Sequence, residues 1–179
     1  YCPANSGNFI PCSVGMYSNI INATTFDTCI PCPMGTYNNL NPGTISACLN
    51  CTQGYYCPTG TSLPQPCQPN HYCPNGQFMV PCAEGSYYES ISATNENYCR
   101  KCPIGFFCPG KGNGITPCPP GSYSNEIGLA KCETCPEGYS CSLGTIKPEI
   151  CPEMTYAVKG SSGCTQCLSG EYTDGKGSF

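Results

Sequence analysis

The chain has 179 residues and a net charge of −4, and its seven Lys and Arg residues are too few and too scattered to form a nucleic-acid-binding patch. Cysteine accounts for 20 residues, a content typical of disulfide scaffolds that lack a large hydrophobic core. No stretch approaches the roughly 18 consecutive apolar residues needed to span a bilayer, which excludes membrane insertion of this segment.

One short phrase recurs ten times along the chain. The phrase has the form Cys-x-x-Gly-x-aromatic, in which the glycine and the aromatic residue are present in most repeats but not in all. We call its first residue the opening cysteine. Glycine stands three positions after the opening cysteine in eight repeats, and an aromatic residue five positions after it in nine. Arrays with such short repeats are typical of structural material or binding surfaces. The opening cysteines are Cys12, Cys32, Cys51, Cys67, Cys82, Cys102, Cys118, Cys135, Cys151 and Cys167.

Each repeat predicts an extended start, a tight turn at the glycine and a short strand. Asn70 fits the glycine position because asparagine tolerates the left-handed backbone region, whereas Met154 predicts a different turn. The aromatic residues are expected to pack internally, across a disulfide or the next repeat. With 21 Gly and 19 Pro residues, helix is disfavoured. The expected fold is therefore an elongated rod of small disulfide-rich repeats, formed by short β-hairpin and loop modules with very little helix.

The cysteine spacing divides the chain into modules. An open module has no cysteine between the opening cysteine and the cysteine that closes its loop; in the other type, an inserted cysteine directly follows the aromatic position. The expected organisation is a partial repeat plus an open module (1–31), an open module (32–50), two modules with inserted cysteines (51–81), an open module (82–101), two two-bridge modules (102–134 and 135–166) and the start of a truncated module (167–179). Because both ends fall inside a repeat, we expect a segment of a longer array.

Spacing alone leaves the disulfide connectivity open. Bonds within each Cys-x-x-Cys pair would form tight, easily reduced rings. The nearly constant loop length instead favours long loops, with inserted cysteines bonded across to the next loop. This scheme leaves Cys12 and Cys167 for partners outside the segment. It predicts the pairs Cys2–Cys29, Cys32–Cys48, Cys51–Cys67, Cys57–Cys73, Cys82–Cys99, Cys102–Cys118, Cys108–Cys132, Cys135–Cys151 and Cys141–Cys164.

Two N-glycosylation sequons support secretion. Asn22-Ala23-Thr24 lies in a polar stretch between cysteines, and Asn50 begins a second sequon, Asn50-Cys51-Thr52. The second signal is the weaker one because its middle residue is a cysteine that is expected to be bonded. We therefore expect N-linked glycans at Asn22 and Asn50.

The repeated phrase resembles the ephrin-receptor-like cysteine-rich repeats, which occur in tandem in large secreted or surface proteins, many of them from protists. It is also similar to tumour-necrosis-factor-receptor and furin-like modules. The resemblance covers nearly the whole chain and implies a ladder of disulfide-linked loops with an architectural or binding role and no active site. Association of such modules with extracellular filaments implies a filament subunit. The residues that carry the resemblance are Cys12, Gly15, Tyr17, Cys29 and Cys32, and Cys102, Gly105, Phe107 and Cys118.

Chemical roles compete with this structural one. Cys29, Cys32, Cys48 and Cys51 have the spacing of a four-cysteine zinc ribbon, although the cysteines that follow lack ligand pairing. His71 is the only histidine and is expected to be an exposed loop residue rather than a general base. We therefore expect no catalytic residues, no metal site and no cofactor.

Three functions remain in order of preference. The first is an extracellular or cell-surface structural segment, a subunit or stalk of a glycosylated filament, coat or appendage, whose partners are other copies or neighbouring repeats. The second is a ligand-binding or adhesion receptor ectodomain. The third is an intracellular zinc-binding protein.

Overall fold

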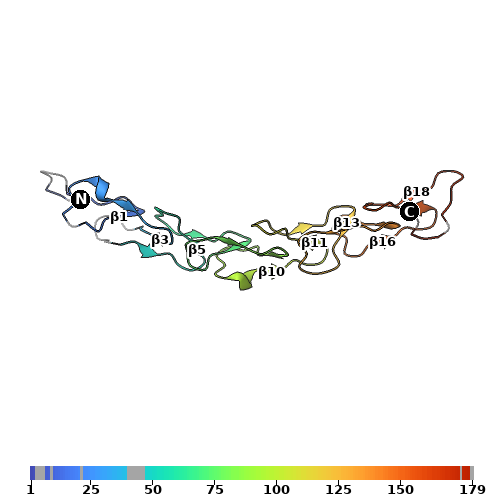
Figure 1. Cartoon of the computed structure of the whole chain (residues 1–179), viewed down its shortest axis with the longest axis horizontal. Helices are drawn as coiled ribbons and strands as arrows, with labels where there is room; N and C mark the ends of the chain where they lie inside the picture. Colours follow the sequence, from blue (N-terminus) through green and yellow to red (C-terminus); the bar gives the residue numbers. More distant parts are fainter. Residues whose placement is uncertain (3–6, 9, 21, 40–46, 174, 178–179) are drawn as a thin grey trace. The chain divides into compact units, whose positions relative to one another are not determined.

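The computed structural model describes residues 1–2, 7–8, 10–20, 22–39, 47–173 and 175–177 (Figure 1). The chain forms two compact units. The first comprises Tyr1–Val80 and Ser90–Tyr98, and the second comprises Pro81–Glu89 and Cys99–Phe179. In the described part of the chain, helix is limited to two single 3-10 turns, η1 (Phe26–Thr28) and η2 (Glu96–Tyr98).

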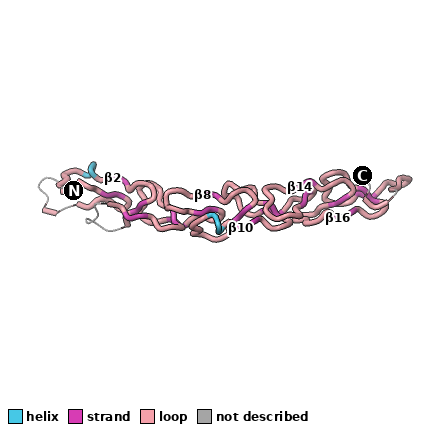
Figure 2. The backbone as a smooth tube through the Cα atoms, turned by 60° about the horizontal axis from the view of Figure 1, so that its bottom comes forward, coloured by secondary structure: helices cyan, strands magenta, loops and turns pink. Residues whose placement is uncertain are grey.

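The first unit is built from short antiparallel hairpins whose strands are two residues long. Loops make up most of its path, as the pink tube in Figure 2 shows. Strand β7 (His71–Tyr72) follows the hairpins, and β8 (Val80–Pro81) spans the point of division between the units. The hairpins pair β1 (Met16–Tyr17) with β2 (Ile30–Pro31), β3 (Thr36–Tyr37) with β4 (Leu49–Asn50), and β5 (Tyr55–Tyr56) with β6 (Gln65–Pro66).

The second unit repeats the same hairpin. Together with the first unit, this confirms the expectation of small disulfide-rich hairpin modules with very little helix. The pairs are β9 (Ser86–Tyr87) with β10 (Arg100–Lys101), β11 (Phe106–Phe107) with β12 (Thr116–Pro117), β13 (Ser122–Tyr123) with β14 (Glu133–Thr134), β15 (Tyr139–Ser140) with β16 (Glu149–Ile150), and β17 (Thr155–Tyr156) with β18 (Thr165–Gln166).

The repeated phrase explains the register of each hairpin. The first strand is formed by the two residues after the phrase glycine, and the second by the two residues before the next opening cysteine. In the β3–β4 hairpin, the Thr36 N–H donates to the Pro33 carbonyl over 3.1 Å, with Gly35 at φ 84° between them. A positive φ at this point gives a type II turn, which glycine adopts without a steric penalty from Cβ.

Met154 adopts the same turn, which corrects the expectation that it would turn differently. Its φ is 66°, close to the 61° of Asn70 at the equivalent position. The Met154 N–H donates to Thr173 Oγ1 over 3.0 Å, and its carbonyl accepts from the Cys167 N–H over 3.1 Å. These bonds hold the backbone in the left-handed conformation, which is unfavourable for a residue with a Cβ, and the side chain is exposed to solvent.

The buried core consists almost entirely of disulfide sulfur. The largest fully buried side chains are ten cysteines and Ser124. The phrase aromatics lie outside this core: most are half-buried, and Tyr172 is 82% exposed. The expected internal packing of the aromatics is therefore only partial, because the cysteines make up nearly all of the fully buried core.

Candidate functional site

The repeating structural unit of this chain is the disulfide hairpin. Each disulfide joins an opening cysteine to one partner in the same module. Where an inserted cysteine is present, it is the partner, six residues along the chain, with Cα–Cα distances of 5.9–6.1 Å: Cys51–Cys57, Cys67–Cys73, Cys102–Cys108 and Cys135–Cys141. Where none is present, the next cysteine is the partner, 13–17 residues on: Cys12–Cys29, Cys32–Cys48, Cys82–Cys99, Cys118–Cys132 and Cys151–Cys164.

This pairing corrects most of the sequence scheme. The bonds Cys32–Cys48 and Cys82–Cys99 were predicted correctly, because these modules have no inserted cysteine. Cys12 is bonded rather than left over, and the two unbonded cysteines are Cys2 and Cys167. The wrong pairs are Cys2–Cys29, Cys51–Cys67, Cys57–Cys73, Cys102–Cys118, Cys108–Cys132, Cys135–Cys151 and Cys141–Cys164.

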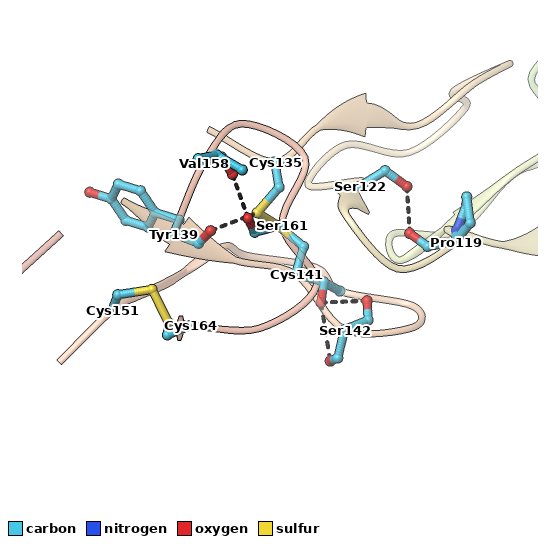
Figure 3. The surroundings of a disulfide bond; sticks show 11 residues. Pro119, Ser122, Cys135, Tyr139, Cys141, Ser142, Cys151, Val158, Ser161 and Cys164 are labelled. Atoms are coloured by element: carbon cyan, nitrogen blue, oxygen red, sulfur yellow. Dashed lines mark hydrogen bonds between the residues drawn. A yellow bond between two sulfur atoms is a disulfide. The ribbon is translucent and has the colours of Figure 1, made fainter. Parts of the chain in front are cut away.

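The reason for the error is the tight turn. The turn at the phrase glycine reverses the chain, so an inserted cysteine arrives opposite its own opening cysteine, within disulfide reach. Figure 3 shows this for Cys135–Cys141, with the Tyr139 ring pointing away from the bond. Each of the ranges 102–134 and 135–166 consequently contains two hairpins with one disulfide each, rather than one module with two crossed bridges.

In some modules the position of the inserted cysteine is buried although another residue occupies it. Asn38 and Ser124 stand six residues after their opening cysteines, as Cys57 does, and both are buried. Asn38 Nδ2 donates to the Met16 carbonyl over 2.7 Å, and Ser124 Oγ donates to the Glu126 carbonyl over 3.1 Å. Hydrogen bonds satisfy these buried polar groups in place of a disulfide. The sequence patterns considered above missed them, although their fixed offset from the opening cysteine was a usable signal.

Successive modules interlock through the phrase glycines. A Cβ on Gly121 would lie 2.2 Å from the Gly160 carbonyl oxygen, and one on Gly15 would lie 2.2 Å from that of Gly60. In each case the contacted module is the next but one along the chain. The phrase glycine thus permits both the turn and the close approach of another module's backbone. The sequence predicted only the turn.

Backbone hydrogen bonds continue the interlock. The Gly121 N–H donates to the Cys141 carbonyl over 2.8 Å, and the Cys141 N–H donates to the Ser161 carbonyl over 3.1 Å. The Gly160 N–H returns to the Cys135 carbonyl over 2.9 Å. Because the disulfides are confined to single modules, the covalent chain, these bonds and the glycine contacts hold neighbouring modules together.

The four cysteines with the spacing of a zinc ribbon are not available as metal ligands. Cys29, Cys32, Cys48 and Cys51 all lie in disulfides, so their sulfurs are not thiolates available to zinc. Within the described ranges, no group of three or more His, Cys, Asp or Glu side chains has the arrangement of a metal site. His71 lies half-buried in β7, with Nδ1 2.9 Å from the Pro69 carbonyl oxygen.

The two sequon asparagines are both exposed, but their backbones differ. Asn22 lies in a turn outside the named strands, with φ 61°, whereas Asn50 is the second residue of β4 and pairs with Thr36. Asp174, one of the two aspartates, lies outside the described residues.

One ionisable pair is visible in the second unit. The hydrogen bond that the Tyr123 hydroxyl makes with Glu133, together with burial and the Glu133 charge, raises the pKa of the Tyr123 phenol above its ordinary value. The two residues are directly paired across the β13–β14 hairpin. A single carboxylate and a phenol stabilise this hairpin but do not form a catalytic arrangement.

None of the helices in the described part of the chain has the length and apolar character of a membrane span. Comparison of the chain with protein-family models and with curated proteins finds no match.

Proposed function

We propose that this chain is an extracellular structural repeat segment, a subunit or stalk of a filament, coat or cell-surface appendage built from ephrin-receptor-like modules. The observation that carries the proposal is the replacement of a hydrophobic core by disulfides. All but two of the 20 cysteines are bonded, and they supply nearly all of the fully buried side chains. Disulfides persist in oxidising surroundings, which favours a location outside the cell.

The proposed mechanism is mechanical rather than catalytic. In each module one disulfide closes a covalent ring that contains the first strand of the hairpin, so pulling on the chain ends can extend only the residues outside that ring. Within each unit, the glycine contacts and backbone hydrogen bonds then link modules to the two that follow them, as Gly121 does with Cys141 and Gly160. Interfaces between modules that are close together in the chain are the usual basis of stability in repeat proteins.

A receptor or adhesion ectodomain is the second candidate. Its support is the series of large apolar side chains on loops, including Leu63 (64% exposed), Ile127 (66%) and Leu143 (64%). Exposed apolar side chains of this size can contact a protein ligand as readily as another copy of the chain. The zinc-binding alternative has no comparable support, because its four candidate ligands are bonded to other cysteines.

Expression of the chain through a eukaryotic secretory pathway, followed by electron microscopy and analytical ultracentrifugation, separates the two candidates. A structural subunit should associate with itself in a concentration-dependent way and give fibres or sheets. Replacement of Ile127 and Leu143 by serine should weaken that association, whereas replacement of the exposed polar Asn125 and Ser142 by alanine should not. A protein that stays monomeric at all concentrations, with the double serine variant indistinguishable from it, would favour the ectodomain instead.

A further inference from the structure

The two sequons differ in how the fold restrains them, and this difference has a consequence for glycosylation. We propose that Asn22 accepts an N-linked glycan whether or not its module has folded, whereas Asn50 accepts one only before the Cys51–Cys57 disulfide closes. The inference rests on the proposed passage through a secretory pathway.

The group transfer itself requires an accessible acceptor. The Asn side-chain nitrogen bonds to C1 of the first sugar of a polyprenyl-diphosphate oligosaccharide, the C1–O bond to phosphate breaks, and the lipid diphosphate leaves. The amide proton passes to a base of the transferase. Both the acceptor Asn and the Thr two positions on must therefore reach the transferase together, which requires a sequon whose backbone can leave its own fold.

The Asn50 sequon is restrained at each of its three residues. Asn50 pairs with Thr36 in the β3–β4 hairpin. The Cys51 N–H donates to the Gly35 carbonyl over 2.8 Å, and its sulfur is bonded to Cys57.

The third residue of this sequon, Thr52, begins the tight turn of the next module. Its carbonyl accepts the Tyr55 N–H over 3.1 Å, and Gly54 follows at φ 80°. Once the disulfide has formed, the sequon can enter the transferase only if the β3–β4 pairing before it and the turn after it are both broken. The asparagine side chain is nevertheless exposed, so a glycan attached earlier is compatible with the fold.

The Asn22 sequon carries much less restraint. Asn22, Ala23 and Thr24 lie outside the named strands, and none of them is a cysteine. Asn22 and Thr24 are exposed, while the buried Ala23 accepts one backbone hydrogen bond from the Cys2 N–H over 2.6 Å. Disulfide closure at Cys12–Cys29 forms a wide loop that leaves the side chains of Asn22 and Thr24 exposed.

The test is glycopeptide mass spectrometry of the chain expressed in a eukaryotic secretory host, with the occupancy of each asparagine measured on the intracellular and the secreted protein. Cys57→Ser leaves the Asn50-Cys51-Thr52 sequon intact but removes the disulfide. Cys73→Ser is the matched control, because it removes the equivalent Cys67–Cys73 bond of the next module and leaves Cys51–Cys57 in place. Because glycan occupancy is also measured on the intracellular chain, a variant that is not secreted still gives a result.

We expect high occupancy at Asn22 in all three proteins. At Asn50 we expect low occupancy in the unmodified protein and in Cys73→Ser, with a several-fold rise in Cys57→Ser. Equal occupancy at both sites in the unmodified protein, an unmodified Asn22, or no rise in Cys57→Ser would overturn the inference. None of these results bears on self-association, so failure of the inference remains distinguishable from failure of the structural role.

Discussion

At the scale of single residues, the phrase glycine has two separate functions. It permits the positive φ of the turn, and it makes room for the carbonyl of the module two repeats further on. Gly121 has both functions, whereas Gly170 has a positive φ but no atom within 4 Å of the point where a Cβ would stand. Alanine variants of Gly121 and Gly170 therefore separate the energetic cost of a Cβ at positive φ from the cost of a clash with the neighbouring module.

Gly170→Ala should lower the stability of its module by about 1–2 kcal/mol, the usual cost of a Cβ in left-handed backbone. Gly121→Ala should cost clearly more, because its Cβ would lie 2.2 Å from the Gly160 oxygen. Chemical denaturation gives the stabilities, and hydrogen exchange at the Gly160 and Cys141 amides shows whether the loss is local. If the two variants were equally stable, the close approach of the modules would not exist in solution.

The Tyr123–Glu133 pair predicts a dependence on alkaline pH. Because the pKa of the folded Tyr123 phenol is raised, the neutral phenol favours the folded state. This contribution is complete below the ordinary tyrosine pKa and is lost as the pH rises through the higher folded-state value. Glu133→Gln should shift part of the tyrosinate absorbance titration to lower pH, and Tyr123→Phe should remove that component.

The control for this titration is Glu137→Gln, which removes an exposed carboxylate of the adjacent module. It should leave the late-ionising component in place. A titration curve that is the same for Glu133→Gln and the unmodified protein would show that the Tyr123–Glu133 hydrogen bond does not persist in water.

At the scale of the element, the hairpin determines the disulfide. The sequence correctly indicated hairpins, turns at the phrase glycine and scarce helix, because these follow from local backbone chemistry. It did not indicate that Cys51 bonds to Cys57, because loop length along the chain does not report which cysteines a turn brings face to face. Disulfide formation requires Cα atoms about 4.4–6.8 Å apart, and the turn places the inserted cysteine within that range.

Trypsin offers a direct test of this pairing in the second unit. Cleavage after Lys101 and Lys111 isolates a peptide that contains Cys102 and Cys108 and no other cysteine. From unreduced protein, this peptide should be recovered alone, lighter by two hydrogens than after reduction, because its disulfide is internal. Recovery of the same peptide only in covalent linkage to the one carrying Cys118 would instead establish the long-loop scheme.

At the scale of the whole molecule, sulfur takes the place that aliphatic side chains have in ordinary domains. The fully buried set contains cysteines but none of the Leu, Ile, Val or Phe side chains in the described ranges. Breaking the disulfides should therefore remove the main source of stability, since each native bond in a small secreted module contributes about 2–5 kcal/mol.

Reduction with a phosphine under otherwise native conditions should abolish the strand signal in circular dichroism and expose the chain to proteases. Thiol titration in denaturant should count two reactive groups before reduction, Cys2 and Cys167, and 20 after it. Retention of protease resistance after complete reduction would mean that apolar packing, not sulfur, holds the modules together.

The length of the module, its turn, its strands and its dependence on cysteine could be read from the residues, because each follows from positions close together in the chain. Which cysteines bond and how the modules interlock became clear from the three-dimensional arrangement. Cys135 meets Cys141 because a turn folds back between them, and Gly121 meets Gly160 because their two modules, with one hairpin between them in the chain, approach at backbone distance. The disulfide follows from a local chain reversal that loop lengths alone do not reveal, whereas the glycine contact depends on the paths of several segments at once.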